Sequence, residues 1–454
     1  MNTPPADTPA QPQLRFADAP GALPGIGHGL AALKDPLGFL TGLHAHGDLV
    51  RIRVGTWRAY IACHPEVAYR VLQDDRNSDK GGRIIDKAAE FGGTGILMCP
   101  HTEHRRRRRI VQPAFDRAHL RHYAAVMSRH VDRITSSWQP GPVPPLAEAS
   151  SITTSVAAET FFGETLSAAE TAAVKLSVTT VFNDAYRQVV APDLLLRLPT
   201  RRNHHYEQAR RHLQATVEKI IATYRAREAA GSDLLAHILR EHNEADGGLT
   251  DDEAYNEILG LLLAGVESTA NVIAWACLML AQHPHIQEQV AAETREVLDG
   301  HPATWEALPR LQITTRVINE TLRMYPPAWI SSRIVRHDSE LVPGHTVPVG
   351  ATVLYSPYLL HHRPDLYTRP SLFHPDRWLD PHTPQRPRDG YLPFAAGGRQ
   401  CIGNDFGHIQ ATIALATITD RWRLHPPAAH PTPRIHLTLR PPPTTLNATP
   451  RRTP

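Results

Sequence analysis

The chain has 454 residues, of which 41% are hydrophobic, and a formal net charge of +3. That hydrophobic fraction is enough for a large buried core, and the charge is too small to indicate a nucleic-acid partner by itself. The four cysteines, Cys63, Cys99, Cys277 and Cys401, lie far apart and form no CxxC pair. Such spacing is typical of neither a disulfide framework nor a zinc cluster, and it favours a reducing, cytoplasmic location.

The first half of the chain is predicted to be mostly helical. Residues 1–20 are polar and rich in proline without a signal-peptide pattern, so a disordered leader is expected. Two alternating runs on either side of Gly55 predict a hairpin. Residues 76–100 are rich in glycine and are expected to be irregular. Long helices are expected from there to about residue 240, interrupted at two clusters of prolines.

The segment at 258–281, ILGLLLAGVESTANVIAWACLMLA, is long and apolar enough to span a membrane. Glu267 lies near its centre, where a carboxylate in lipid costs about 3 kcal/mol, and this favours a buried core helix. Thr250 and Glu253 have the spacing of a capping box. We therefore predict one long buried helix over 250–283.

HIQEQVAAETREVL and TTRVINETLRMY are predicted to form further helices, and helix is then replaced from Pro326 to Gly390. Short β-like runs and turns occupy 326–390, and RIHLTLR alternates as a short strand does. The chain is again rich in proline near its end, and 441–454 are expected to form a disordered tail. The predicted fold class is mainly α with a minor β part that includes a small sheet near the N-terminal region. A single domain over 21–440 is expected between leader and tail.

The stretch LPFAAGGRQCIGND surrounds Cys401 with glycines and places Arg399 two residues before it. Glycine allows tight turns and close approach of the backbone to a flat ligand. Arg399 and the positive end of a helix expected to begin at the cysteine both favour a thiolate. A lone cysteine is often a small core residue, but a thiolate on such a loop suits an axial ligand of haem iron.

The pattern Phe394-x-x-Gly397-x-Arg399-x-Cys401-x-Gly403 resembles the haem-binding loop of the cytochrome P450 family. HRRRRRIVQPAF, AGVEST, NETLRMYPP and FHPDRW resemble further motifs of that family, in the same order. The resemblance covers nearly the whole chain. It implies the P450 fold, with a long central helix over haem b, and Cys401 as the thiolate ligand of the iron.

The resemblance also implies roles for residues outside the cysteine loop. The cofactor-binding residues are expected to be His104, Arg108, Ala264, Arg333, Phe394, Gly397, Arg399, Cys401 and Gly403. His104 and Arg108 share one helix face and are expected at the haem propionates with Arg333 and Arg399. Glu320, Arg323 and Arg377 are expected to form a buried structural triad that braces the haem loop.

The AGVEST segment is expected to activate oxygen. Glu267 is predicted to act as the acid of a proton relay, with a satisfied buried acid as the alternative. Ser268 stands where the family usually has threonine, and Thr269 follows it. Serine keeps the hydroxyl but lacks the methyl group that restricts its rotamers.

The substrate is expected to be hydrophobic, a terpenoid first and a polyketide second. The predicted lining residues are all apolar: Ile84, Ile85, Phe91, Phe182, Leu262, Trp329 and Ile330. Arg105, Arg106 and Arg109 are expected to face solvent on the thiolate side and to attract an acidic electron donor. Ferredoxin with ferredoxin reductase, or flavodoxin, is the expected donor, and a monomer is expected.

Three functions remain open at this point. An external monooxygenase, which hydroxylates or epoxidises its substrate with O₂, accounts for both the acid and the hydroxyl. A haem-thiolate enzyme of multistep oxidation, rearrangement or peroxide-driven chemistry is the second. A non-enzymatic haem-binding protein is the third.

Overall fold

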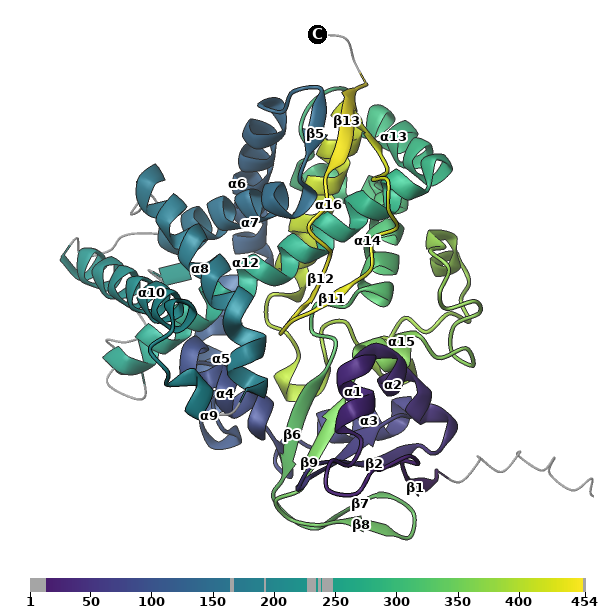
Figure 1. The fold of residues 1–454 in the computed structure, drawn as a ribbon. Helices are drawn as coiled ribbons and strands as arrows, with labels where there is room; N and C mark the ends of the chain where they lie inside the picture. The colour runs from purple at the N-terminus through teal and green to yellow at the C-terminus, as the bar shows by residue number, and fades with distance from the viewer. Residues whose placement is uncertain are drawn as a thin grey trace, which may run out of the picture.

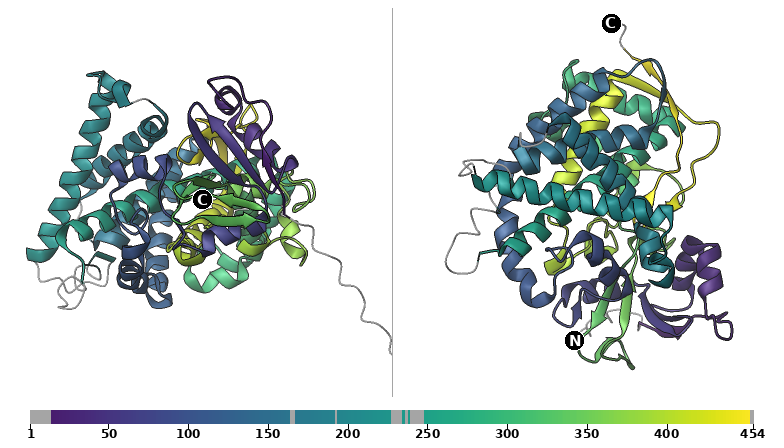
Figure 2. Two further views of the ribbon diagram at one scale, coloured as in Figure 1. Left: turned by 90° about the horizontal axis from the view of Figure 1, so that it is seen from below. Right: turned by 60° about the vertical axis from the view of Figure 1, so that its left-hand side comes forward.

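The computed structural model describes residues 14–163, 167–191, 193–226, 234–235, 238 and 248–451. A helical part and a part built around a β-sheet lie side by side (Figure 1; Figure 2). The helices are α1 Gly29–Lys34, α2 Pro36–Gly42, α3 Pro65–Gln73, α4 Arg83–Gly92, α5 His101–Val111, α6 Arg117–Ser136, α7 Pro145–Phe162, α8 Ala168–Val190, α9 Asp193–Leu196, α10 Arg201–Ala226, α12 Asp251–Gln282, α13 Pro284–Leu298, α14 Gln312–Met324, α15 Pro357–His361 and α16 Asn404–Arg421. The strands are β1 Phe16–Asp18, β2 Leu49–Val54, β3 Trp57–Ala62, β4 Ser78–Asp79, β5 Gly141–Val143, β6 Ser331–Val335, β7 Ser339–Val342, β8 His345–Val347, β9 Thr352–Tyr355, β10 Trp422–His425, β11 Arg434–Ile435, β12 Leu439–Arg440 and β13 Leu446–Pro450.

The central helix α12 begins and ends where the sequence predicts. The amide of Glu253 donates to Thr250 Oγ1 at 3.2 Å, and the amide of Thr250 donates to Glu253 Oε2 at 3.0 Å. This capping box starts a helix of 32 residues, which is about 50 Å long at 1.5 Å per residue. Among the described residues, α12 is the one helix whose length and composition would allow a membrane span, and 83% of its most apolar window is buried in the protein. The prediction of a core helix is confirmed.

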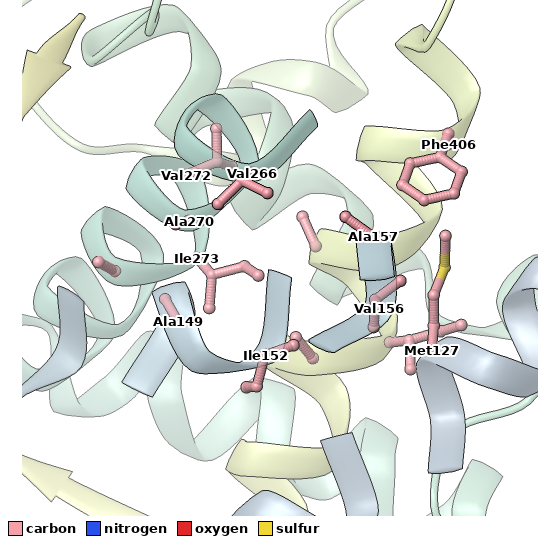
Figure 3. Close-up of a cluster of buried hydrophobic side chains, with 14 of the residues drawn as sticks. Met127, Ala149, Ile152, Val156, Ala157, Val266, Ala270, Val272, Ile273 and Phe406 are labelled. Atoms are coloured by element: carbon pink, nitrogen blue, oxygen red, sulfur yellow. The ribbon is translucent and has the colours of Figure 1, made fainter. Parts of the chain in front are cut away.

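In the main hydrophobic core α12 packs against α7 and α16, and α6 packs against the same two helices. Figure 3 shows side chains from these four helices in contact. The contributing residues include Met127 of α6, Ile152 and Val156 of α7, Val266, Ala270 and Ile273 of α12, and Phe406 of α16. Each buried side chain of valine or leucine size contributes about 1.5–3 kcal/mol. This packing gives α12 a fixed place, so one of its faces can serve as a wall of the functional site.

The β-sheet has six strands in the order β1-β2-β3-β9-β6-β4. Strands β2 and β3 pair antiparallel with Val54 opposite Trp57, so the predicted hairpin at Gly55 is confirmed. Strand β9 joins the edge of this hairpin in parallel, and β6 pairs with β9 antiparallel. The sheet thus brings the early part of the chain next to residues 331–355, which supply one side of the functional site.

The prediction that 76–100 are irregular is wrong in part, because Arg83–Gly92 form helix α4. Ile85, Ala88 and Phe91 recur at intervals of three residues and are buried on one face of this helix. Gly82 and Gly93 lie just outside the helix with φ of +86° and +74°. The glycines therefore end the helix at both sides instead of preventing it.

Both predicted disordered ends contain strands. Phe16–Asp18 of the expected leader pair with β2, while residues 1–13 lie outside the described part of the chain. Leu446–Pro450 of the expected tail form β13, the middle strand of a second sheet between β10 and β5. The run RIHLTLR forms the two strands of a hairpin, β11 and β12, instead of one strand. Pairing with distant strands orders these short, proline-flanked segments, and local sequence does not reveal such partners.

Candidate active site

Cys401 lies in the loop between the short 3-10 helix Gly397–Arg399 and α16. Its amide donates to the carbonyl of Phe394 at 3.0 Å, which closes the loop on itself. Gly397 has φ +72°, and a Cβ at this residue would lie 2.1 Å from the carbonyl oxygen of Leu72. The left-handed backbone and the close contact both require glycine at this position.

Cys401 lines a cavity between this loop and α12. The wall from α12 consists of Leu261, Ala264, Gly265, Ser268, Thr269 and Val272. The opposite wall and the ends include Leu97, Phe115, Phe161, Ile318, Leu322, Pro327, Ala328, Ser331, Tyr355, Phe394, Ile402, Gly403, Phe406 and His408. The α12 residues recur at intervals of three and four, so one face of the helix runs along the cavity. Most of the lining is apolar, as a large flat hydrophobic group requires.

Three cationic side chains gather beside the cavity. Lys80 and Arg399 line it, and Arg333 is 1% exposed. Burial lowers the pKa of the Lys80 ammonium well below its ordinary value, and the charges of Arg333 and Arg399 lower it further. The Nε atoms of Arg333 and Arg399 are buried and have no hydrogen-bond partner within the described residues. Clustered cations with unused donors indicate an anion site, and the two carboxylates of a haem match it.

The cationic cluster is only partly neutralised by acidic side chains. Arg399 donates to Asp79 Oδ1 at 2.8 Å and to the carbonyl of Cys99 at 2.6 Å. Arg336 also donates to Asp79, at 3.2 Å, so this carboxylate is shared. The guanidinium of Arg333 lies 5.2 Å from the ring centre of Tyr355. Positive charge thus remains available to a bound carboxylate.

His104 and Arg108 of α5 have different environments. His104 is buried, and burial together with the charges of Arg399 and Arg108 lowers its pKa to about 4. It is therefore neutral at pH 7. Arg108 donates to the carbonyls of Gln400 at 2.6 Å and Gly398 at 3.2 Å, so it braces the cysteine loop. The contact of Arg108 with a haem propionate stays a prediction.

Cys401 keeps accessible surface where it lines the cavity, and the surrounding protein buries its thiol on the other sides. Burial raises its pKa, whereas the amide of Gly403 and the charges of Arg108 and Lys80 act in the opposite direction. The protein thus offers a sulfur with positive charge and an amide donor around it. Such surroundings suit a thiolate once a metal ion replaces the proton.

The acid and the hydroxyls of AGVEST lie on different faces of α12. Ser268 and Thr269 line the cavity, and Ser268 Oγ donates to the carbonyl of Ala264 at 2.7 Å. Glu267 is buried on another face, where its Oε1 accepts from the guanidinium of Arg440. The structure brings the two hydroxyls to the cavity, and it gives the acid a cationic partner that the sequence analysis did not identify.

Glu320, Arg323 and Arg377 form a buried cluster. Arg323 donates to both oxygens of Glu320, at 2.9 and 3.0 Å. Arg377 Nε donates to Glu320 Oε1 at 2.9 Å. The carbonyl of His361 accepts from Arg323 at 2.9 Å, and His361 Nε2 accepts from the amide of Leu392 at 2.9 Å. The cluster is thereby connected to the start of the cysteine loop.

The run of arginines at 105–109 is divided between several partners. Arg106 pairs with Glu253 of α12 and keeps 33% of its side chain exposed, so it faces solvent only in part. Arg107 is buried and pairs with Glu103, Glu253 and Glu257. Arg105 and Arg109 are exposed, as expected. Both border an open surface hollow together with Arg76, Gly397 and Gly398.

None of the seven residues expected to contact substrate lines the cavity that contains Cys401. Ile85, Phe91, Phe182, Leu262 and Trp329 are buried in the hydrophobic cores, and Ile84 and Ile330 pack against the core near the sheet. Leu262 illustrates the reason, because its neighbour Leu261 lines the cavity and each step along a helix turns the side chain by about 100°. Apolar composition identified the segments but not the face that each presents.

Comparison with known proteins agrees with this geometry. The family model described as "Cytochrome P450" matches residues 19–448. The chain is 38% identical over 407 residues to the pentalenene oxygenase of Streptomyces avermitilis, which is 89% of this chain and 90% of that protein. It is also 38% identical to two proteins of Streptomyces melanosporofaciens, a cyclooctatin synthase over 443 residues and a cyclooctat-9-en-7-ol 5-monooxygenase over 427. The match to the cyclooctatin synthase covers 96% of this chain and 96% of that protein. The match to the monooxygenase covers 93% of each.

The chain belongs to the cytochrome P450 family. It is a P450 monooxygenase, and membership of the family implies a haem-thiolate cofactor. The cavity fits that cofactor, since it is apolar along its walls, has a cysteine on one side and has cations with unused donors beside it.

Two polar residues of the site escaped the sequence analysis. Lys80 stands in a glycine-rich stretch that gives no indication of burial. Arg440 lies 173 positions from Glu267, and nothing in the local sequence links the two. In the sequence, Lys80 is marked by its neighbour Asp79. A lysine next to an aspartate is also typical of a solvated loop, so this pattern does not identify the site.

Proposed function

We propose that the protein hydroxylates or epoxidises a hydrophobic, weakly functionalised terpenoid, with dioxygen and with two electrons from a separate donor protein. The observation that carries the proposal is the cavity, which sets Cys401 opposite the hydroxyl-bearing face of α12 and is otherwise largely apolar. The names of the three Streptomyces relatives, which refer to oxidation of pentalenene and cyclooctatin-type compounds, support a terpenoid.

We propose haem b as the cofactor, with Cys401 Sγ as the ligand of its iron. Lys80, Arg333 and Arg399 would hold its carboxylates, and neutral His104 can donate one further hydrogen bond. Gly265 leaves room for Phe161 in the cavity wall, since a Cβ there would lie 3.3 Å from the ring of Phe161. When bound, the haem supplies the iron at which dioxygen is reduced and cleaved.

The residues of α12 would deliver protons to the cavity. The hydroxyls of Ser268 and Thr269 are the closest proton-carrying side chains that α12 presents to it. A hydroxyl passes a proton by accepting one and releasing another, and this needs an acid behind it. Glu267, the residue before Ser268, is the acid that we assign to this role. Apolar walls exclude bulk water from the reacting bond.

The substrate would contact the cavity residues on the α12 side and near Pro327, rather than the seven predicted from the sequence. Leu97, Leu261 and Ala328 are the candidates, because they line the cavity with apolar side chains. Lys80 and Arg399 also line the cavity and are assigned to the haem carboxylates, so the remaining apolar wall would select for shape and hydrophobicity. Enlarging Ala328 to Leu is expected to weaken binding of bulky terpenoids, whereas Leu262→Ala, on another face of α12, changes the substrate preference little.

The hollow bordered by Arg76, Arg105 and Arg109 is the proposed docking site of an acidic electron donor such as a ferredoxin. It lies against Gly397 and Gly398 of the cysteine loop, so a donor there would be close to the thiolate. Charge reversal in the variant Arg109→Glu is expected to weaken ferredoxin binding about tenfold at low salt. Arg58→Glu, at an exposed position of β3, is the control.

The decisive experiment is the spectrum of the reduced protein with carbon monoxide. Wild type and the control Cys277→Ala are expected to show the band of thiolate ligation, and Cys401→Ala to lose it. Pentalenene and cyclooctat-9-en-7-ol are the first compounds to test for a shift in spin state and for product. Unchanged haem binding and an unchanged band in Cys401→Ala would refute the assignment of the ligand. Absence of product with a broad terpenoid panel would refute the substrate class.

A further inference from the structure

Glu267 is held by side chains from its own helix and from the C-terminal hairpin. Its Oε1 accepts from Arg440 Nε, from Thr438 Oγ1 at 3.1 Å and from Asn271 Nδ2 at 3.3 Å. Arg440 and Thr438 belong to the β11–β12 hairpin, which packs against α12. The side chains of Arg440 and Glu267 are 8% and 10% exposed, so both charges are largely removed from water.

The two oxygens of Glu267 are not equivalent. All the hydrogen bonds that the structure gives this carboxylate within the described residues end on Oε1. Oε2 has no donor among the described residues, and it is not one of the fully enclosed polar atoms without a partner. It is therefore the oxygen that water can reach. A carboxylate anchored by one oxygen and open at the other can exchange a proton without losing its position.

Arg440 also connects this carboxylate to α8. Its Nη1 donates to Oδ1 of Asn183, while its Nε donates to Glu267. One guanidinium thus spans α8, α12 and the hairpin. The planar fork of arginine holds such a geometry, whereas a lysine ammonium would supply the charge without fixing the direction.

Building on the proposed function, we propose that Arg440 is the positioning residue of the proton relay: it binds Oε1 of Glu267 and leaves Oε2 to exchange protons with water. In each transfer Oε2 takes one proton from a hydronium ion of the bulk solvent, which becomes a neutral water molecule, and the carboxyl then gives one proton to a water molecule or hydroxyl on the cavity side. The carboxylate is restored, so no other reactant is needed. Arg440 itself neither gains nor loses a proton.

A merely structural role for Arg440 is the alternative, because the hairpin is also attached to α12 elsewhere. Trp275 Nε1 donates to the carbonyl of Leu439 at 3.3 Å. Removal of Arg440 would then loosen the hairpin without altering the protonation of Glu267. The variants that separate these roles are Arg440→Gln, Arg440→Lys and the matched control Arg434→Gln, since exposed Arg434 lies directly opposite Arg440 in the hairpin.

The first test is infrared spectroscopy of the substrate-free holoprotein at pH 7. A buried carboxylate without its cation takes up a proton. Arg440→Gln is therefore expected to show a protonated carboxyl band that is lost in the double variant with Glu267→Gln. Wild type, Arg440→Lys and Arg434→Gln are expected to lack the band. Its absence from Arg440→Gln, in a preparation with a normal haem spectrum, would overturn the proposal.

The second test is a double-mutant cycle on dioxygen consumption by the holoenzyme with ferredoxin and ferredoxin reductase, with pentalenene as the probe. Arg440→Gln is expected to lower the rate about tenfold, with partial recovery in Arg440→Lys. In a Glu267→Gln background it should cause no further loss, because the arginine acts through that carboxyl. An equal loss in both backgrounds would overturn the proposal. If wild type makes no product from any terpenoid, the proposed function fails, and the infrared result alone decides the role of Arg440.

Discussion

Glu320 and Glu267 are both buried carboxylates paired with arginine, but their hydrogen bonds are distributed differently. Glu320 accepts at both oxygens, from Arg323 and Arg377 and from the amide of His374. Glu267 accepts at one oxygen only. A saturated carboxylate has no site left for proton exchange and serves as a brace. A half-saturated one keeps such a site, and this difference supports the proposed structural role of Glu320 and the proposed catalytic role of Glu267.

The largest effect on stability is expected for Glu320, the carboxylate that accepts hydrogen bonds at both oxygens. Glu320→Ala would leave Arg323 and Arg377 as buried charges without a carboxylate. Loss of one partner of a buried ion pair costs about 3–5 kcal/mol. Chemical denaturation followed by the haem absorbance should show a decrease of this size in the free energy of unfolding. A loss below about 1 kcal/mol would mean that the cluster behaves as a surface pair does.

Low pH should destabilise the region around Arg323 through protonation of His362. Burial and the charge of Arg323 lower the pKa of this histidine to about 4, against about 6.5 in the unfolded chain. As the pH falls from 6.5 to 4, His362 binds a proton in the unfolded state but stays mostly unprotonated in the folded state. Stability therefore falls across this window, by up to about 3 kcal/mol. His362→Gln should remove that part of the loss in melting curves at pH 7 and pH 4, and equal pH dependence in both proteins would contradict it.

For Glu267, which accepts hydrogen bonds at one oxygen only, the main expected effect of a substitution is on enzymatic activity. Glu267→Gln keeps an oxygen that accepts from Arg440 but cannot supply the acid. Product formation is expected to fall about 100-fold. The free energy of unfolding is expected to fall by about 1.5–3 kcal/mol, because Arg440 keeps a hydrogen-bond acceptor but loses the opposite charge. Turnover and denaturation measured on one preparation test both parts. A large loss of stability with unchanged turnover would make Glu267 another brace.

The smallest effect is expected at the cavity itself. Ser268→Ala removes a hydroxyl that is held by the carbonyl of Ala264. Thr269 also lines the cavity and can replace it in part. We expect about tenfold less product per dioxygen consumed, with the remainder released as peroxide. Ser268→Thr, which restores the usual residue of the family, should match or exceed wild type in this ratio, and unchanged coupling in Ser268→Ala would exclude a relay role.

The parts of the site that follow from short-range patterns could be predicted from the sequence. The capping box of Thr250 sets the start of α12, and the spacing of Glu320 and Arg323 places both on one helix face. Gly397 is needed because its backbone is left-handed and touches Leu72. In each case the physical cause lies within a few residues of the motif or in the backbone itself.

The parts that depend on partners far along the chain could not be predicted. Arg440 meets Glu267 across 173 positions, and Arg399 meets Asp79 across 320. The surroundings of Lys80 depend on Arg333 and Arg399, which lie more than 200 positions away in the chain, and no local pattern encodes that. Helix α4 was missed because its flanking glycines conceal the regular spacing of Ile85, Ala88 and Phe91.

Strand β13 has a consequence for the order in which the chain acquires its structure. It is the middle strand of its sheet, yet it follows both neighbours in the chain, and its partner β5 lies about 300 residues earlier. During synthesis, α6 and α7, which flank β5, leave the ribosome long before the strand that covers it. The edge of β5 therefore stays unpaired until residues 446–450 have been synthesised, and chaperones have a defined interval in which to protect it.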